Sequence, residues 1–211
     1  MSRLAFPPQG LYAITREGYP DPERLGEAVA AAIRGGAVAV QYRAKAAADP
    51  LREAERLLAV CRAAGVPLIV NDSVDLAARI EADGVHLGRD DVALAEARQR
   101  LGPGAIIGVS CYDSLERAIQ AAAGGADYVA FGRFFPSRTK PTAPCARLET
   151  LHEARRRLAV PIVAIGGITP GNGDSLVRAG AGLLAVIEAV FGEDDPERAA
   201  RRFRPVFGSP G

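Results

Sequence analysis

The sequence alternates eight short apolar runs with stretches whose apolar residues are spaced three and four positions apart. The runs are rich in leucine or β-branched residues, and turn residues follow each one. Such runs are typical of buried strands and the spaced stretches of amphipathic helices, so the alternation predicts successive βα units. The expected strands are Leu11–Thr15, Ala37–Gln41, Leu68–Val70, Val85–Leu87, Ile106–Val109, Tyr128–Phe131, Ile162–Ile165 and Leu183–Ile187.

The length of these units favours a closed barrel. Each unit has about 22 residues, which is room for a strand, a helix and two short loops. We therefore expect an α/β fold, a single-domain (β/α)8 TIM barrel over residues 1–211, with the barrel at about 11–207 and a short loose C-terminal tail. The alternative is an open doubly wound sheet, but its glycine fingerprint is missing after the first strand, where Thr15-Arg16-Glu17-Gly18 stands.

Capping residues predict where helices begin and end. Asp49-Pro50 marks one start, Asp113 with Glu116 forms a capping-box pattern at another, and Asp195-Pro196 opens a closing helix that runs to Phe203. Glycines predict the helix ends, and they are Gly35-Gly36, Gly65, Gly102, Gly124-Gly125 and Gly180.

Composition excludes several classes of protein. Among 211 residues, 26 Lys and Arg balance 25 Asp and Glu, so no overall field favours a nucleic acid or an anionic membrane as partner. The N-terminus lacks the apolar run of a signal peptide, and the run from Leu183 stops at Glu188, far short of a membrane span. We expect a cytoplasmic protein that acts on small molecules, and a homo-oligomer is compatible with the sequence.

The three cysteines do not suggest redox or metal chemistry. Cys61, Cys111 and Cys145 are odd in number and widely spaced, which fits neither a disulfide framework nor a zinc site. Cys61 shares a helical face with Leu51 and Leu58, so we expect it in the core. No serine or Cys–His pair stands in a context for covalent catalysis.

Polar residues follow the predicted strands, whereas mostly Gly, Ala, Val and Pro precede them. Because active sites of these barrels lie at the carboxyl ends of the strands, the functional groups should gather on one rim. The segments at this rim are Gln41-Tyr42-Arg43-Ala44-Lys45, Asn71-Asp72, His86 to Asp91, Ser110, Phe131 to Pro141, Gly166 to Thr169, and Glu188.

Two features of the rim indicate phosphate binding. Arg43 and Lys45, two residues apart at a strand end, should share one side of the pleat and direct two cations at one ligand. Gly166-Gly167, with a short turn into Asn172, can expose backbone N–H groups to an anion, although a glycine pair is also ordinary turn material.

Asp72 and Asp91 are the favoured metal ligands, because one or two carboxylates suit a Mg²⁺ ion that keeps waters and shares a ligand's phosphates. The alternative is that each aspartate caps the helix after it. His86 has two interpretations of equal weight, acid–base chemistry or a packed and hydrogen-bonded side chain. His152, in a polar helical stretch, is expected on the surface.

Six motifs in combination resemble one enzyme family over nearly the whole chain. They are Val40-Gln41-Tyr42-Arg43-Ala44-Lys45, Val70-Asn71-Asp72, Ala82-Asp83-Gly84-Val85-His86-Leu87-Gly88, Gly108-Val109-Ser110, Phe131-Gly132 through Thr139-Lys140, and Ala164-Ile165-Gly166-Gly167-Ile168. The sequence with these motifs closely resembles the thiamine-phosphate synthases. The resemblance implies a Mg²⁺-dependent transferase that joins 4-amino-2-methyl-5-(diphosphooxymethyl)pyrimidine to 4-methyl-5-(2-phosphooxyethyl)thiazole. Diphosphate leaves first, through a pyrimidine carbocation, and thiamine phosphate forms.

The resemblance also implies a role for each matching residue. The pyrimidine diphosphate would contact Gln41, Tyr42, Arg43, Ala44, Lys45, Asn71, Ser110 and Lys140. The thiazole phosphate would contact Ser137, Arg138, Thr139, Gly167, Ile187 and Glu188. Asp72 and Asp91 would bind Mg²⁺. The catalytic residues would be Arg43, Lys45, Ser110 and Lys140. The three cations among them would stabilise negative charge that is largest in the transition state.

Some positions depart from the family's common pattern. Arg89 stands where glutamine is usual, Ala44 where an acidic residue is usual, and Glu188 where serine is common. A carboxylate beside a phosphate repels it, so at Glu188 only the backbone is carried over. Arg133 has no assigned role. The segment that follows Lys140 is either part of a lid or a plain connector.

Three other functions compete with this one. The thiazole tautomerases share the fold, but they usually have histidine where Arg133 stands and lack the two metal carboxylates. Another phosphosugar isomerase or epimerase would use the glycine turn without needing Arg43, Lys45 and Lys140. A non-catalytic thiamine-precursor binding protein would be favoured if the rim cations or metal ligands were missing, and they are present.

Overall fold

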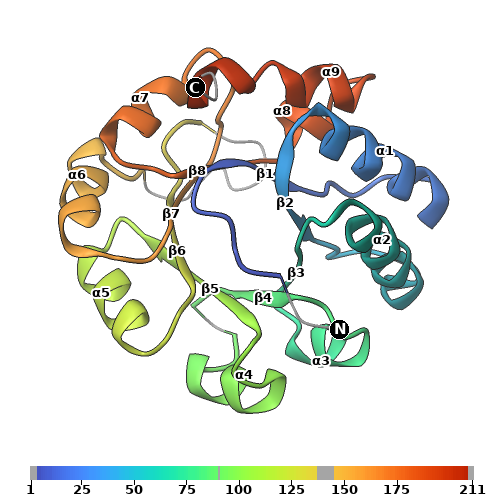
Figure 1. Cartoon of the computed structure of the whole chain (residues 1–211), viewed down its shortest axis with the longest axis horizontal. Coiled ribbons are helices and arrows are strands. Elements are labelled where there is room, and N and C mark those ends of the chain that lie inside the picture. Colours follow the sequence, from blue (N-terminus) through green and yellow to red (C-terminus); the bar gives the residue numbers. More distant parts are fainter. Residues whose placement is uncertain (1–3, 90, 137–144, 209–211) are drawn as a thin grey trace.

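The chain folds into a closed barrel of eight parallel strands in chain order, with β8 pairing with β1 (Figure 1). The computed structural model describes residues 4–89, 91–136 and 145–208. The predicted (β/α)8 barrel is confirmed. The strands are β1 Gly10–Ile14, β2 Ala37–Tyr42, β3 Leu68–Asn71, β4 Gly84–Leu87, β5 Ile106–Tyr112, β6 Tyr128–Gly132, β7 Ile162–Ile165 and β8 Leu183–Val186.

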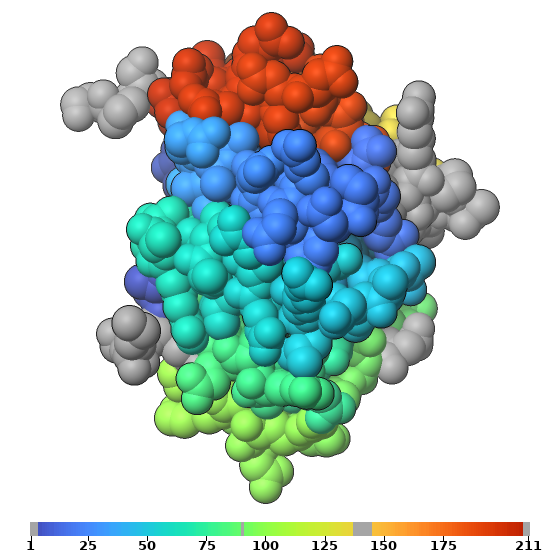
Figure 2. Space-filling view, turned by 90° about the vertical axis from the view of Figure 1, so that its right-hand side faces the viewer, coloured from blue at the N-terminus to red at the C-terminus, as the bar shows by residue number. Residues whose placement is uncertain are grey.

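Helices form a ring outside the strands (Figure 1). They are α1 Pro22–Gly35, α2 Pro50–Ala64, α3 Val74–Arg79, α4 Leu94–Leu101, α5 Leu115–Ala123, α6 Leu148–Arg157, α7 Gly173–Ala179, α8 Glu188–Phe191, α9 Pro196–Arg201 and the 3-10 helix η1 Arg204–Phe207. The C-terminal helices pack beside α1 (Figure 2), where Arg34 pairs with Glu197 at 2.8 Å. Helices α1 and α9 therefore meet and complete the ring. No helix within the described ranges is long and apolar enough to cross a membrane.

Most of the predicted helix boundaries are confirmed. The carboxylates of Asp49 and Asp195 each accept a hydrogen bond from the backbone N–H three residues on. The predicted capping box at Asp113 is wrong. Ser114 caps α5 instead, and the Asp113 carboxylate accepts hydrogen bonds from Arg147 and Thr150. A long-range ion pair has thus drawn Asp113 away from the local role that its position suggested.

The core has two parts, one between the strands and the helices and one inside the barrel. Cys61 lies in the outer part, fully buried, and burial raises the pKa of its thiol to about 12, so the thiol is not ionised near neutral pH. This confirms Cys61 as a core residue. The inner part contains Tyr12 and Tyr128, the two largest fully buried side chains, directly below the predicted functional rim.

Candidate active site

A cavity of about 460 Å³ opens at the carboxyl ends of the strands. We call it the central cavity. Its polar lining includes residues from β2, β3, β4 and β5 and from the loops after β6, β7 and β8, and its walls are apolar side chains from β1, β6, β7 and β8. The predicted site residues on its wall are Gln41, Arg43, Asn71, Ser110, Gly167, Ile187 and Glu188. Residues that the sequence did not predict are Tyr12, Ile14, Tyr112, Ala130, Val163, Ala185, Val186, Ala189 and Glu193.

Strand β2 divides its motif between two environments. Gln41 and Arg43 line the central cavity, whereas Tyr42 and Ala44 line a separate hollow of about 410 Å³ outside the barrel. Successive side chains of a strand point to opposite faces, which explains the division between Gln41 and Tyr42, while Arg43 and Ala44 follow the end of β2. The expectation that the side chains of Tyr42 and Ala44 contact the pyrimidine diphosphate is therefore not supported by where they lie.

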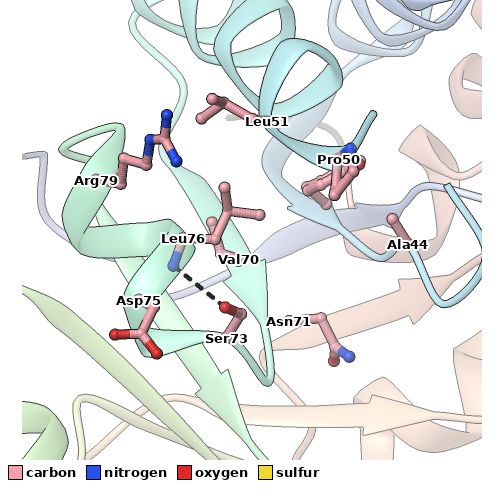
Figure 3. A pocket seen from close by; sticks show the side chains of 10 residues that line it. Ala44, Pro50, Leu51, Val70, Asn71, Ser73, Asp75, Leu76 and Arg79 are labelled. Atoms are coloured by element: carbon pink, nitrogen blue, oxygen red, sulfur yellow. Dashed lines mark hydrogen bonds between the residues drawn. The ribbon is translucent and has the colours of Figure 1, made fainter. Parts of the chain in front are cut away.

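We call this second space the flanking hollow (Figure 3). It is lined by residues of α2 and α3, and in the view the Leu51 side chain of α2 and the Arg79 guanidinium of α3 lie at its upper end. On its floor, the Tyr42 hydroxyl donates to the Glu53 carboxylate at 2.8 Å. Burial and the neighbouring Glu53 raise the pKa of Tyr42, so the phenol stays protonated. Asn71 is on the wall of both spaces.

Arg43 and Lys45 do not share a pleat, contrary to the prediction. Strand β2 ends at Tyr42, so both residues belong to the loop that follows it. The backbone N–H of Arg43 donates to the Thr15 hydroxyl at 2.9 Å, which ties the start of this loop to the end of β1. Lys45 is exposed, its backbone N–H donates to Glu17 at 2.5 Å, and it is not part of the described lining of the central cavity.

His86 is packed and hydrogen-bonded, one of the two interpretations that its position allowed. Its side chain is 8% exposed. One ring nitrogen, Nδ1, lies 2.9 Å from the Tyr128 hydroxyl, and the other, Nε2, lies 2.9 Å from the Ser110 hydroxyl. Both nitrogens are thus engaged with neutral hydroxyl groups inside the barrel. His152, as predicted, is exposed.

The glycine turn after β7 is held by close approach of the chain after β6. Gly166 has φ 104° and a Cβ there would lie 2.3 Å from Cβ of Arg133, while Gly167 has φ 65° and a Cβ there would lie 2.3 Å from the Pro136 carbonyl oxygen. Both positions therefore require glycine. The Asn172 amide fixes the turn by accepting from the Thr169 N–H at 2.8 Å and donating to the Gly167 carbonyl at 3.1 Å.

Glu188 stands where β8 leads into α8, and its carboxylate lies 3.8 Å from a guanidinium nitrogen of Arg16. Both side chains are roughly half exposed, at 50% and 40%. Arg16 follows β1 and was not predicted as a site residue, because no motif singled it out. The arginine partly offsets the negative charge that Glu188 brings to this side of the central cavity.

The sequence of this chain matches the family model described as thiamine monophosphate synthase over residues 11–190. The chain belongs to the thiamine monophosphate synthase family. A thiamine-phosphate synthase from Methylococcus capsulatus is 56% identical over 98% of this chain and 93% of its own length. One from Thiobacillus denitrificans is 52% identical over 96% of each chain. The structure of a thiamine phosphate pyrophosphorylase from Pyrococcus furiosus is 35% identical, with a TM-score of 0.84 over 94% of this chain and 95% of the other.

Membership of the thiamine monophosphate synthase family confirms the function and the transferase class expected from the motifs. It does not assign individual residues. Four predicted site residues, Ser137, Arg138, Thr139 and Lys140, lie outside the described residues. Of the cations left without a role, Arg133 lines the central cavity, and the Arg89 guanidinium lies 4.8 Å from the centre of the Tyr112 ring.

The two predicted metal ligands gather at one strand end. The backbone N–H of Asp72 donates to the His86 carbonyl at 2.9 Å, and the Asp91 carboxylate accepts from the Gly88 N–H at 2.5 Å, so both flank the end of β4. The capping alternative is wrong for both. Ser73 caps α3, and α4 has no side-chain cap.

The protein itself supplies only some of the oxygen ligands that a Mg²⁺ ion needs. Asp72 and Asp91 offer two hard carboxylates, and no cluster of three or more His, Cys, Asp or Glu side chains with metal-binding geometry occurs among residues 4–89, 91–136 and 145–208. Mg²⁺ commonly keeps waters and shares substrate phosphates beside one or two carboxylates. Two aspartates at the rim are therefore compatible with a metal that arrives with a diphosphate.

Proposed function

We propose that this chain joins 4-amino-2-methyl-5-(diphosphooxymethyl)pyrimidine to 4-methyl-5-(2-phosphooxyethyl)thiazole and forms thiamine phosphate and diphosphate. The observation that carries the proposal is the central cavity, because polar groups that the resemblance assigns to each of the two substrates line its wall. Gln41 of β2, Arg43 just after β2 and Ser110 of β5 line it, and so does the Gly167 turn after β7. The cavity thus offers one region for each phosphorylated substrate.

In the first half of the reaction, the bond between the pyrimidine methylene carbon and the diphosphate oxygen breaks. The electron pair leaves with the diphosphate, and a pyrimidine carbocation remains. Negative charge grows on the leaving group as the bond breaks, so a fixed guanidinium at Arg43 stabilises the transition state more than the bound substrate. Lys45 and Lys140 are proposed to add positive charge to the same group, and the backbone of the Arg43 segment to position it.

In the second half, the lone pair of the thiazole nitrogen forms the new carbon–nitrogen bond. No proton is transferred, so no general base is required. A carbocation reacts with water if water reaches it, and the apolar walls of the central cavity limit that access. These walls include Ile14, Val163, Ile165 and Ala185, with Ala130 beside them.

Asp72 and Asp91 are proposed to hold Mg²⁺, which would neutralise charge on the diphosphate when bound. The backbone of Asp72 and the carboxylate of Asp91 are bonded at the end of β4, and Asn71, which lines the central cavity, is next to Asp72 in the chain. This adjacency supports a shared site for the metal and the diphosphate.

The thiazole phosphate is proposed to bind near Gly167 and the backbone at Ile187 and Glu188, together with Ser137, Arg138 and Thr139. The glycines make room for the backbone there, and Arg16 lies beside the carboxylate of Glu188, which with Glu193 brings negative charge to the described lining of the cavity. The Glu188 side chain would turn toward Arg16 rather than toward the phosphate.

The direct test is to incubate the purified protein with both substrates and Mg²⁺ and to measure thiamine phosphate and diphosphate. We expect equal amounts of the two products. Reactions without the thiazole phosphate and with excess chelator serve as controls. A folded protein that forms no thiamine phosphate would contradict the proposed function.

A further inference from the structure

Five polar side chains form one continuous hydrogen-bonded chain through the interior of the barrel. Gln41 Nε2 donates to the Tyr12 hydroxyl, the Tyr12 and Tyr128 hydroxyls are bonded to each other, and Tyr128 contacts Nδ1 of His86, whose Nε2 contacts the Ser110 hydroxyl. Each of the four contacts is 2.9 Å long. Gln41 and Ser110, the two ends of this hydrogen-bonded chain, both line the central cavity.

With the Gln41 amide nitrogen placed toward Tyr12, the donors along this hydrogen-bonded chain can be assigned in one direction. The amide nitrogen of Gln41 can only donate, so the Tyr12 oxygen accepts there. Burial raises the pKa of both tyrosines, so each keeps its hydrogen near neutral pH. If Tyr12 donates to Tyr128, then Tyr128 donates to His86 Nδ1, and the Nε2 hydrogen of His86 goes to Ser110.

The opposite direction is disfavoured. If Tyr128 donated to Tyr12, the Tyr12 hydrogen would have no acceptor among the described residues, in a side chain that is only 1% exposed. A buried donor without a partner is costly, whereas the first direction uses every hydrogen. Aligned bonds of this kind also strengthen one another.

This direction fixes what each end offers to a ligand. Because Nε2 of Gln41 is bonded to Tyr12, the amide carbonyl oxygen is left to accept a hydrogen bond at the cavity wall. Because Ser110 accepts from His86, its own hydrogen is left to donate. An aminopyrimidine has an exocyclic amino group that donates and ring nitrogens that accept, which complements these two ends.

Neighbouring residues hold the chain in place. His86, Gly108 and Tyr128 are aligned across β4, β5 and β6, and a Cβ on Gly108 would lie 1.9 Å from Cζ of Tyr128. The missing side chain therefore lets the Tyr128 ring cross β5 to reach His86. Phe6 stacks on Tyr128 with ring centres 3.9 Å apart, and its segment crosses the middle of the barrel in Figure 1 before it enters β1.

We propose that Tyr12, Tyr128 and His86 are positioning residues, which set Gln41 as a hydrogen-bond acceptor and Ser110 as a donor for the aminopyrimidine ring. None of the three is assigned a role by the motifs. The inference rests on the proposed function, because it concerns how the pyrimidine substrate of that reaction is recognised.

The test compares Tyr12→Phe and Tyr128→Phe with the unaltered protein. Loss of the Tyr12 hydroxyl releases the Gln41 amide, so we expect KM for the pyrimidine diphosphate to rise about tenfold, the equivalent of one hydrogen bond. The KM for the thiazole phosphate should stay the same. Tyr12→Phe keeps the Tyr128–His86 contact, so it carries the test if Tyr128→Phe does not fold.

An analogue makes the test specific. A pyrimidine diphosphate that lacks the 4-amino group has nothing to donate to Gln41, so its inhibition constant should be the same for the unaltered protein and Tyr12→Phe. The double variant should resemble the stronger single variant, because both changes break one chain. Tyr19→Phe, a tyrosine outside the chain and outside the described cavity lining, is the matched control and should change neither constant.

Each other outcome contradicts one statement. One contrary outcome is that the variants raise KM for the pyrimidine diphosphate and the inhibition constant of the analogue equally. Another is that they raise KM for the pyrimidine diphosphate and KM for the thiazole phosphate together. In either case the tyrosines have only a structural role and the inference is wrong. If the unaltered protein makes no thiamine phosphate, the proposed function is wrong instead. Circular dichroism and thermal unfolding establish that each variant is folded.

Discussion

The end of β2 and the two residues after it alternate between two different surroundings, an inner face and an outer face. On the inner face, Gln41 and Arg43 line the central cavity, beneath which neutral side chains form a directed hydrogen-bonded chain. On the outer face, Tyr42 and Ala44 line the flanking hollow, and the Tyr42 hydroxyl is bonded to Glu53 of α2 (Figure 3). The inner face is proposed to serve the chemistry, and the outer face attaches α2 to the strand.

This difference teaches that a motif at a strand end is not a unit of function. Alternation along this segment places Gln41 and Arg43 at the central cavity and Tyr42 and Ala44 at the flanking hollow. Asn71, the last residue of β3, does not follow this division, because it lines both the central cavity and the flanking hollow. Substitutions on the two faces should therefore change different measured quantities. Arg43→Ala and Tyr42→Phe test this division, and substitutions at Asp72, Asp91 and Gly167 test the rest of the proposed site.

Arg43→Ala should have the largest effect. Removing one group that stabilises charge in the transition state lowers kcat by about 10²–10³, and stability should change little because Arg43 is at the partly exposed cavity edge. Steady-state kinetics provides the measurement. Arg52→Ala, an exposed arginine of α2, is the matched control. Equal kinetics for the two variants would remove Arg43 from the proposed mechanism.

Asp72→Asn and Asp91→Asn should come next. Loss of a residue that only supports a metal ligand lowers metal affinity by about 10–100-fold. Loss of a carboxylate ligand itself should therefore raise the half-saturating Mg²⁺ concentration by at least this factor. Asparagine at position 91 can still accept from the Gly88 N–H, so the local contact is kept. Asp75→Asn, an exposed residue on the wall of the flanking hollow, is the control. Unaltered Mg²⁺ dependence in both variants would show that the aspartates do not bind the metal.

Gly167→Ala should have a moderate effect that is limited to one substrate. A left-handed backbone costs an alanine about 1–2 kcal/mol, and the added Cβ would lie 2.3 Å from the Pro136 carbonyl oxygen. We expect KM for the thiazole phosphate to rise about tenfold. Gly171→Ala is matched, since a Cβ there meets only Thr169 Oγ1 at 3.8 Å. A similar rise for both variants, or a rise only for the pyrimidine diphosphate, would contradict the assignment of this turn.

Tyr42→Phe should have the smallest effect on the reaction and a measurable effect on stability. The variant loses the hydrogen bond to Glu53, which contributes about 1 kcal/mol to the free energy of unfolding. Urea denaturation measures this loss, and the fall in kcat/KM should be far smaller than for Arg43→Ala. Unchanged stability with a large fall in kcat/KM would place the Tyr42 side chain in the reaction and break the comparison.

The sequence by itself determined the barrel and its functional rim. Strand and helix patterns are local, so the eight runs and most capping residues were enough to predict the architecture. The rim followed from the rule that parallel strands end on the same side. The turn at Gly166 and Gly167 was also predicted from the sequence. Glycine adopts positive φ freely, and this property depends only on the residue itself.

Only the tertiary structure decided which rim residues face the ligand and which groups support them. Arg43 and Lys45 were expected on one side of a pleat, but the strand ends before both. Tyr12 and Tyr128 read as ordinary core residues of apolar runs, yet they are 116 positions apart in sequence and their hydroxyls meet at 2.9 Å. Such a contact exists only once the barrel closes, and no local pattern encodes it, because hydrogen bonds between distant strands depend on register and on the space that neighbouring side chains leave.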